Sequence, residues 1–353
     1  MKIIHVLKLL KGHSSGFNKQ IPSIVKSSPN NYIYNTASSK KNDNDKYINF
    51  LKLIKYFIQK DNIIIHFHSL LSSKSVLVAF ISLVLKKEIV YSPRGEFRHS
   101  AILCKSSLKK ILFFKLINPI LKRSNIHFLS EVEYSEYVFL NGIPLNYVII
   151  PNAIIIDKNI DQFEYVKPKL NEFKILYVGR ILVELKNIRL LISSCKALQK
   201  KINNVCEIKL KIQLVGSFGS VNDKEKFYSL IKKHKVESIV EIIGEVPNFK
   251  IGNYMRNADL LYNLSFSEGF PNIVLEALYF KLPILCSQNT GIQHYFNNSK
   301  VVSFCSLSST DFINKTFKII TSNSIEFKKE DFDIFRYDFH NIQKEFSKFY
   351  KSL

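Results

Sequence analysis

The sequence has few of the features that mark disulfide-bonded, metal-binding or membrane-spanning proteins. Its five cysteines are scattered and form no Cys-x-x-Cys pair; they are Cys104, Cys195, Cys206, Cys286 and Cys305. This spacing argues against a disulfide framework or a zinc site and fits a reducing cytoplasm. The longest uncharged apolar run, Ser75–Leu85, is far shorter than the roughly 20 residues that span a bilayer. We therefore expect a cytoplasmic chain, soluble or peripheral at the inner face of a membrane.

Acidic residues are also scarce. The chain has 29 Asp and Glu against 51 Lys and Arg, a formal net charge of +22. Such a surface attracts anions, such as nucleotides, nucleic acids or acidic lipid headgroups, although a composition rich in Lys, Asn and Ile contributes to the excess. Charge alone leaves a nucleic-acid-binding protein as an alternative. Against it, the 28 Phe and 17 Tyr follow the core pattern, and no nucleic-acid recognition motif is present.

Short β-rich apolar runs alternate with segments of helical periodicity. The runs that predict strands are Ile3–Leu7, Ile63–His68, Ile89–Ser92, Ile126–Ser130, Val148–Ile150, Ile175–Val178, Ile212–Val215, Val240–Ile243, Leu260–Leu264 and Pro283–Ser287. Buried parallel strands separated by helices predict an α/β, doubly wound fold.

The length of 353 residues exceeds one ordinary core and predicts two domains. The strand and helix pattern restarts near residue 173, after the polar segment Asp157–Lys169. We predict two Rossmann-like domains, residues 1–165 and 166–335, that face each other across a cleft. Residues 336–353 are expected to form a helix that packs back toward the N-terminal domain. Ligands of such folds bind at the carboxyl ends of the strands, so functional residues should follow strands directly.

A first candidate motif, Tyr177-Val178-Gly179-Arg180, ends a predicted strand, and Lys186 follows where the next helix should open. Two cations near the start of a helix favour a diphosphate, because charge, N–H donors and helix dipole all attract an anion. They would also stabilise the charge that grows on a diphosphate leaving group. Two solvated surface cations are the alternative in a chain this basic.

A second candidate motif is SEGFPNIVLEAL, residues Ser267–Leu278. Gly269 permits close approach of a ligand to the backbone, and Pro271 suits the first turn of a helix over Asn272–Phe280. The free N–H groups of that turn can bind phosphate or sugar oxygens. Glu268 before the helix and Glu276 inside it could each accept two hydrogen bonds from a diol. An unpaired Glu276 on this apolar helix would be costly.

Residues 175–295 resemble the donor-binding half of glycosyltransferase family 4, the retaining group 1 enzymes with two Rossmann-like domains (GT-B fold). The family signature is two glutamates separated by seven residues. Glu268 and Glu276 match this spacing, and the intervening Gly-Phe-Pro-Asn is typical. The family's glycine after its second strand is similar to Gly216, and its loop near the base is similar to residues 243–246.

The first motif is also similar to the family, which has a Gly-Arg pair after its first C-terminal-domain strand and then a lysine. The resemblance implies that Arg180 and Lys186 bind the diphosphate, and that these two and Glu268 are the catalytic residues. It implies that Glu276 binds the ribose and Glu268 the transferred sugar. The donor-binding residues that it implies are Gly179, Arg180, Lys186, Gly216, Ile243, Val246, Glu268, Gly269, Phe270, Pro271, Asn272, Ile273 and Glu276.

In the N-terminal half the candidates for the expected cleft are Gly12, Gly16, His68 and Arg94. The family's first loop carries glycines over the donor phosphates. Gly12 and Gly16 are not a tandem pair, so an ordinary strand-to-helix turn is an equal alternative. His66-Phe67-His68 follows a strand, and His66 is expected to pack in or beside the sheet.

The run Ser92-Pro93-Arg94-Gly95 resembles a subgroup of the family that builds bacterial surface polysaccharides. Many relatives have a histidine near this strand end, whereas Arg94 takes that place here. Arg94 could bind an anionic acceptor or orient the donor sugar. A second departure is His294, which replaces a family acidic residue.

Residues 98–123 form a basic segment with interleaved apolar residues and no acid between Glu96 and Glu131. The segment predicts contact with an anionic membrane, although a helix packed on the sheet with a solvated basic face would show the same pattern.

We predict a retaining hexosyltransferase-type enzyme (EC 2.4) that moves a sugar from a nucleotide-diphosphate sugar to a saccharide or polyprenol-linked acceptor. The pathways implied are those of bacterial capsule, O-antigen, lipopolysaccharide or exopolysaccharide. No nucleophile is placed for a covalent intermediate, so a front-face mechanism is expected. No metal and no cofactor are expected, because side-chain cations serve the diphosphate. An epimerase or phosphorylase on the same fold is the alternative.

Overall fold

The computed structural model describes residues 1–8, 16–26, 28–37, 46–59, 62–97, 107–155, 171–297, 299–322 and 334–353. The chain forms two compact units. The first contains Met1–Ile155 and Tyr337–Leu353, and the second contains Ile156–Arg336. The predicted boundary at residues 165 and 166 lies outside the described residues. Among the helices described, none combines the length and the apolar character needed to cross a membrane.

The first unit is built on six parallel strands in the order β2-β1-β3-β4-β5-β6. The strands are β1 (Lys2–Leu7), β2 (Asn31–Asn35), β3 (Ile63–Phe67), β4 (Glu88–Tyr91), β5 (Asn125–Phe128) and β6 (Asn146–Ile149). The described helices are α1 (Gly16–Lys26), α2 (Phe50–Ile58), α3 (Ser73–Val84), α5 (Ser107–Leu121), α6 (Glu131–Asn141) and α13 (Phe339–Lys351).

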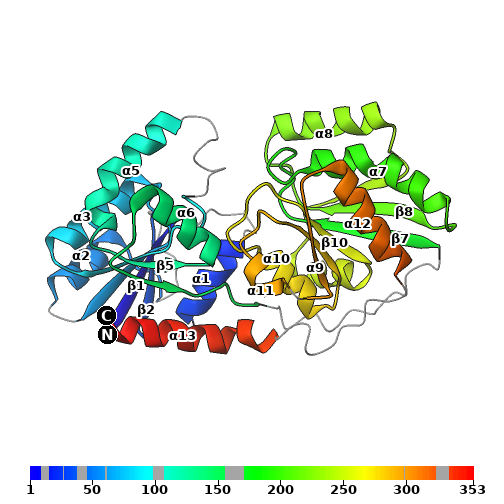
Figure 1. Cartoon of the computed structure of the whole chain (residues 1–353). Coiled ribbons are helices and arrows are strands. Elements are labelled where there is room, and N and C mark those ends of the chain that lie inside the picture. Colours follow the sequence, from blue (N-terminus) through cyan, green and yellow to red (C-terminus); the bar gives the residue numbers. More distant parts are fainter. Residues whose placement is uncertain are drawn as a thin grey trace. The chain divides into compact units, whose positions relative to one another are not determined.

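The two faces of this sheet carry separate apolar layers, because successive side chains of a strand point to opposite sides. One layer joins the strands to α2, α3, α5 and α6. The other joins them to α1 and α13, and Figure 1 shows α13 beside this sheet. The C-terminal helix therefore belongs to the core of the N-terminal unit: Ile342, Phe346, Phe349 and Tyr350 are all buried there.

The second unit repeats the architecture, with six parallel strands in the order β12-β11-β10-β7-β8-β9. The strands are β7 (Glu172–Val178), β8 (Lys209–Val215), β9 (Val240–Gly244), β10 (Leu260–Asn263), β11 (Ile284–Ser287) and β12 (Val302–Cys305). The helices are α7 (Ile188–Asn203), α8 (Val221–His234), α9 (Asn248–Arg256), α10 (Asn272–Tyr279), α11 (Gln293–Phe296), α12 (Ser309–Thr321) and the short 3-10 helix η3 (Ile334–Tyr337).

The α/β class with two Rossmann-like units is thus confirmed, and all ten predicted strands are present within a few residues. Two strands escaped prediction, β2 and β12. Strand β2 has asparagine at both ends, and Ser303 interrupts β12, so neither has a long apolar run. Four described cysteines, Cys195, Cys206, Cys286 and Cys305, are free thiols.

Candidate functional site

The sheet of the second unit reverses its direction of winding between β7 and β10, which are neighbours although far apart in the chain. Loops that leave two such strands run to opposite faces, and the gap between them is the usual ligand position of this fold class. Arg180 and Lys186 follow β7, and Glu268 follows β10. The two sequence motifs therefore meet at the topological switch point of one sheet.

Three glycines end the strands on one side of this point. Gly179, Gly216 and Gly244 end or follow β7, β8 and β9, and all three have positive φ, of 143°, 142° and 84°. The amide of Gly179 donates to the carbonyl of Val215, and that of Gly216 donates to the carbonyl of Gly244. A Cβ on Gly216 would lie 2.0 Å from the carbonyl oxygen of Gly179. Gly216 is therefore required by the packing of two loops.

Lys186 forms an ion pair with Glu268 through Nζ and Oε1, and both side chains are largely buried. Lys186 lies in the turn before α7, which begins at Ile188. It does not open the helix, as the sequence had suggested, because the left-handed Asn187 intervenes. The backbone joins the same two loops, since the amide of Phe266 donates to the carbonyl of Leu185 at 3.0 Å.

Glu268 is held by residues that the sequence did not single out. Ser265 donates to its Oε1 at 3.2 Å, and Asn263 donates to its Oε2 at 3.4 Å. Its carbonyl accepts from the amide of Gly291 at 2.9 Å. The carboxylate therefore has a fixed orientation. Asn263 is the last residue of β10 and is buried. A polar residue at the end of a buried strand is the sequence signal that could have identified it as a partner of Glu268.

Arg180 and Lys186 concentrate positive charge beside this carboxylate. Arg180 is exposed, and its carbonyl accepts from the hydroxyl of Tyr177 at 2.6 Å, which fixes the turn. Burial, and secondly the positive charge of Arg180, lower the pKa of Lys186 to about 8. The carboxylate of Glu268 opposes that shift, because an opposite charge in contact favours the ammonium form.

Helix α10 begins at Asn272, after Pro271, and its N-terminus has no side-chain cap. Its first N–H groups are therefore available to an anion or a sugar oxygen. Phe270 is buried and packs edge-on against Tyr295, with ring centroids 5.6 Å apart. Glu276 is half-buried in the helix.

The remaining predicted donor residues lie near the strand ends. Gly269 and Ile273 are half-buried on either side of Pro271, and Ile243 and Val246 flank the end of β9. His294 is exposed in α11. The structure thus gathers Arg180, Lys186 and Glu268 in one place, while the roles assigned to all these residues stay predictions.

The N-terminal candidates belong to the first unit. Gly12 lies outside the described residues, and Gly16 is the first residue of α1. Arg94 has the left-handed φ of 49° in the turn after β4. Its Nε donates to Nδ1 of His68 at 3.3 Å, and its Nη1 donates to Oδ1 of Asn152 at 3.2 Å. Two of the four candidates, Arg94 and His68, are therefore in direct contact.

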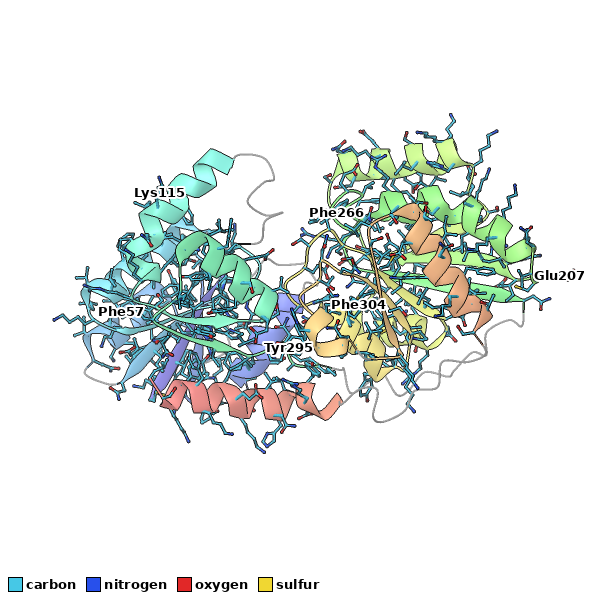
Figure 2. The ribbon with its side chains drawn as sticks, in the orientation of Figure 1. Phe57, Lys115, Glu207, Phe266, Tyr295 and Phe304 are labelled. Atoms are coloured by element: carbon cyan, nitrogen blue, oxygen red, sulfur yellow. The ribbon has the colours of Figure 1, made fainter. Side chains whose placement is uncertain are left out.

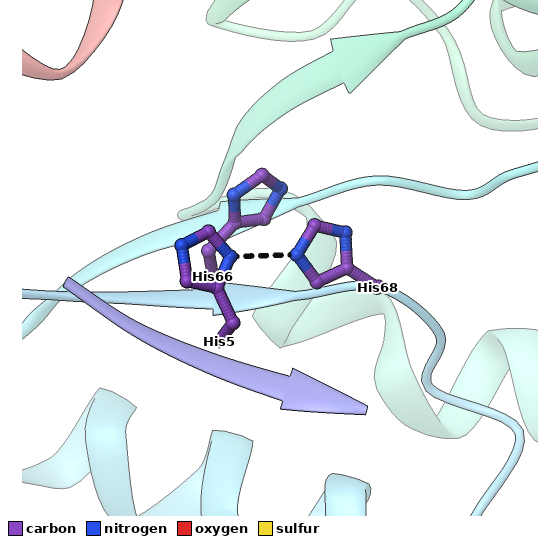
Figure 3. Close-up of side chains that lie close together, drawn as sticks. All are labelled: His5, His66 and His68. Carbon is purple, nitrogen blue, oxygen red and sulfur yellow. Dashed lines mark hydrogen bonds between the residues drawn. The ribbon is translucent and has the colours of Figure 1, made fainter. Parts of the chain in front are cut away.

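His68 belongs to a buried histidine cluster with His5 and His66 (Figure 3). His5 pairs with His66 in the register of β1 and β3, so the two side chains share a face. Ring nitrogens of all three residues lie within 4.8 Å of one another. Nδ1 of His5 and Nε2 of His68 share a hydrogen bond of 2.8 Å.

The cluster fits a hydrogen-bonded network better than a metal centre. Both ring nitrogens of His66 have partners, Tyr350 and Ser92. Both ring nitrogens of His68 also have partners, one of which is the guanidinium of Arg94. A cation would have to displace these bonds beside an existing positive charge.

Burial is the main cause that lowers the pKa of each histidine in this region. It lowers the pKa of His5 and of His127 to about 3, with the charge of Arg94 as a second cause. The pKa values of His66 and His68 are also well below the usual range. All four rings are therefore neutral at physiological pH. The prediction that His66 packs within the sheet is confirmed, since it is fully buried.

Three comparisons with known proteins bear on this architecture. Residues 158–330 match the family model described as "Glycosyl transferases group 1". The putative teichuronic acid biosynthesis glycosyltransferase TuaC of Bacillus subtilis is 38% identical over 55 residues, 16% of this chain and 14% of TuaC. The phosphatidylinositol N-acetylglucosaminyltransferase GPI3 subunit of Saccharomyces cerevisiae is 25% identical over 185 residues, 50% of this chain and 39% of that protein. The chain thus spans less than half the length of either relative.

The HepE protein of Anabaena, in a crystal structure with UDP and glucose, superposes with a TM-score of 0.75 over the full length of both chains. The sequence identity is 15%, so this likeness shows the fold alone.

Proposed function

Residues 158–330 belong to the group 1 glycosyl transferases, and on this premise we propose that the chain transfers a sugar from a nucleotide-diphosphate sugar with retention of configuration. The observation that carries the proposal is the contact of Lys186 with Glu268 at the switch point of the sheet. A cation for the diphosphate and a carboxylate for the sugar lie there side by side. UDP and glucose in the HepE structure support a nucleotide-sugar donor.

In the proposed reaction Arg180 and Lys186 bind the diphosphate and stabilise its growing negative charge. Glu268, oriented by Ser265 and Asn263, accepts hydrogen bonds from hydroxyl groups of the transferred sugar. Glu276 accepts from the ribose. The N–H groups at the start of α10 bind sugar or phosphate oxygens.

A front-face course accounts for retention without a covalent intermediate. The bond from the anomeric carbon to the donor phosphate breaks, and the electron pair leaves with the diphosphate. The acceptor oxygen bonds to the same face, and its proton passes to a phosphate oxygen of the donor. Lys186 and Arg180 neutralise the leaving group, so we propose that no metal or other cofactor is needed. Full activity in the presence of EDTA is the expected result.

We further propose a saccharide or lipid-linked saccharide as acceptor, in the synthesis of a bacterial surface polysaccharide. The names of TuaC and of the GPI3 subunit, which specify teichuronic acid and phosphatidylinositol, support a surface polymer and a lipid acceptor respectively. Arg94, fixed by His68 and Asn152, would bind an anionic group of the acceptor. The enzyme would act at the cytoplasmic face of the membrane.

A thermal-shift panel of nucleotides and nucleotide sugars provides the first test. A ligand that binds only the folded state raises the melting temperature, by an amount that corresponds to about 2.7 kcal/mol at 100 times its Kd. We expect one nucleoside diphosphate and its sugar derivative to stabilise the chain. The donor found in this way is then assayed for release of the nucleotide with and without saccharide acceptors, which separates a transferase from an epimerase.

Substitution of Lys186 tests the site itself. Lys186→Met should lower the transfer rate by about 10²–10³ without loss of the fold, because the ion pair that it breaks is local. Lys196→Met, at an exposed position of α7, is the matched control and should keep full activity. Full activity of both Lys186→Met and Arg180→Met would contradict the assignment.

A further inference from the structure

Helix α3 exposes large apolar side chains to solvent, in addition to Phe80, Ile81 and Leu83, which pack against the core. Its fully buried residues are Ser75, Val78, Ala79 and Ser82. Leu77 and Val84 lie two turns apart, on the same side of the helix. They expose 54% and 76% of their surface. A helix at a water-facing surface normally turns its largest apolar side chains toward the core. The solvent-facing side of α3 therefore carries large apolar side chains of the kind that proteins usually bury.

The helices beside α3 share this character. On α2, Leu51 and Ile58 expose 76% and 78% of their surface. The two helices end side by side, because Nζ of Lys87, just after α3, donates to the carbonyl of Gln59, just after α2, at 3.1 Å. On the other side α3 packs against α5. We call the exposed side chains of α2, α3 and α5 the outer helical layer.

The outer helical layer has no acidic residue, because the sequences of α2, α3 and α5 contain neither Asp nor Glu. Its exposed lysines include Lys55 on α2, Lys74 on α3, Lys115 on α5 (Figure 2) and Lys86 just after α3. Helix α6 packs on the same face of the sheet, yet its sequence EVEYSEYVFLN contains three glutamates. The absence of acid is thus a property of these three helices and not of the whole face.

We propose that the outer helical layer binds the surface of an anionic lipid membrane. Ammonium groups at the ends of α3 meet lipid phosphates, and Leu77, Val84 and Ile58 enter the boundary between headgroups and acyl chains. A second copy of the chain fits this layer poorly, because a two-fold contact would place the lysines of both copies face to face. The layer lies in the first unit, whereas the donor motifs lie in the second.

The proposal names the membrane-binding surface of the proposed enzyme, and vesicle binding tests it without any catalytic turnover. Its failure therefore leaves the donor and transfer experiments untouched. The full chain is mixed with vesicles of phosphatidylcholine with 30% phosphatidylglycerol (about one anionic lipid in three) and separated by flotation. We expect binding to these vesicles, weaker binding at high salt, and little binding to pure phosphatidylcholine.

Two sets of variants separate the apolar and electrostatic contributions. Leu77→Ser with Val84→Ser should lower the partition coefficient by about tenfold. Lys55→Glu with Lys74→Glu should lower it by at least as much, since each lysine near an anionic surface contributes on the order of fivefold. All four positions are exposed, so circular dichroism and the melting temperature should not change.

Matched controls carry the same changes in the second unit. Val205→Ser with Val221→Ser replaces two apolar residues of similar exposure, and Lys224→Glu with Lys232→Glu reverses two exposed charges on α8. These variants should bind like the natural chain. The proposal is overturned if they lose binding equally, if the α2 and α3 variants keep it, or if size-exclusion chromatography shows a dimer that Leu77→Ser with Val84→Ser dissociates.

Discussion

The hydroxyl of Tyr350 hydrogen-bonds to Nδ1 of His66 at 2.6 Å, joining two residues that are 284 positions apart. Two further buried hydrogen bonds follow it in series. Nε2 of His66 is hydrogen-bonded to Oγ of Ser92 at 2.6 Å, and Oγ of Ser92 is hydrogen-bonded to Nδ1 of His127 at 2.6 Å. The series ends where Nε2 of His127 meets the carbonyl of Ile150 at 2.8 Å.

A carbonyl can only accept, so Nε2 of His127 carries the proton and its Nδ1 accepts from Ser92. By the same logic His66 donates from Nε2 to Ser92 and accepts at Nδ1 from Tyr350. Every direction in the series is fixed, provided that both rings are neutral. The last helix of the chain is thus bonded into the middle of the N-terminal sheet.

Removal of the Tyr350 hydroxyl should destabilise this part of the protein. Tyr350→Phe leaves Nδ1 of His66 buried without its donor, which costs about 1–3 kcal/mol. The chain has no tryptophan, so unfolding in urea is followed by circular dichroism. Tyr228→Phe, which removes a hydroxyl from a half-exposed ring on α8, is the control and should have little effect. Equal midpoints for the two variants would contradict the role of the bond.

Stability should fall as the pH drops from 7.5 to 5.5. His5 and His127 have folded pKa values of about 3, below the unfolded value of about 6.5. Between these values the unfolded chain binds protons that the folded chain does not. Each such histidine therefore lowers the free energy of unfolding by up to about 1.4 kcal/mol per pH unit below about pH 6.

Urea titrations at several pH values measure this slope. His127→Gln should reduce it by the share of one histidine. A free energy of unfolding that is constant from pH 7.5 to 5.5 would show that these rings take up protons in the folded state as readily as in the unfolded chain, contrary to the hydrogen-bond directions above.

Glu268→Gln should separate nucleotide binding from transfer. The change removes the charge that neutralises Lys186, so the lysine meets a diphosphate with its full positive charge. We expect binding of the nucleoside diphosphate to be unchanged or a few-fold tighter, while transfer slows by about 10²-fold because the sugar loses a charged acceptor. Isothermal titration with the diphosphate and an initial-rate assay measure the two effects. Weaker diphosphate binding would show that Glu268 does not compete for Lys186.

Gly216→Ala tests the close packing of the β7 and β8 loops. The new methyl group would meet the carbonyl of Gly179 at 2.0 Å, and the positive φ adds backbone strain. The expected loss of stability is at least about 2 kcal/mol. Gly244→Ala is the control, because its φ is also positive but its methyl group would enter open space. The clash predicts a larger loss at Gly216 than at Gly244, measured as the urea midpoint.

Much of the donor half was predictable because its signals are local. The glutamate spacing of residues 268–276 and the glycines at the ends of β7, β8 and β9 are short patterns, and every strand in this half except β12 has an apolar run. Their convergence followed from a general rule, that loops after parallel strands lie at one edge of the sheet. The ion pair itself was not predictable, since Lys186 had been assigned to the diphosphate and Glu268 to the sugar.

The N-terminal unit contains contacts that local sequence patterns do not predict. His5, His66 and His127 lie on strands whose order is β1-β3-β4-β5, and only that order places them beside one another and beside Ser92. The sequence also marked Ser75–Leu85 as an uncharged apolar run. Which side of that helix faces the sheet was decided by tertiary packing, which buries Ser75 and Ser82 and exposes Leu77 and Val84.

The sequence by itself thus determined the fold class and the residue types of the donor motif, because periodicity, turn chemistry and motif spacing act over a few residues. Tertiary structure alone decided that Lys186 meets Glu268 and that Tyr350 bonds to His66. Each of these depends on strand order and on contacts between distant segments. Such contacts form only when the whole chain folds, and no short pattern records them.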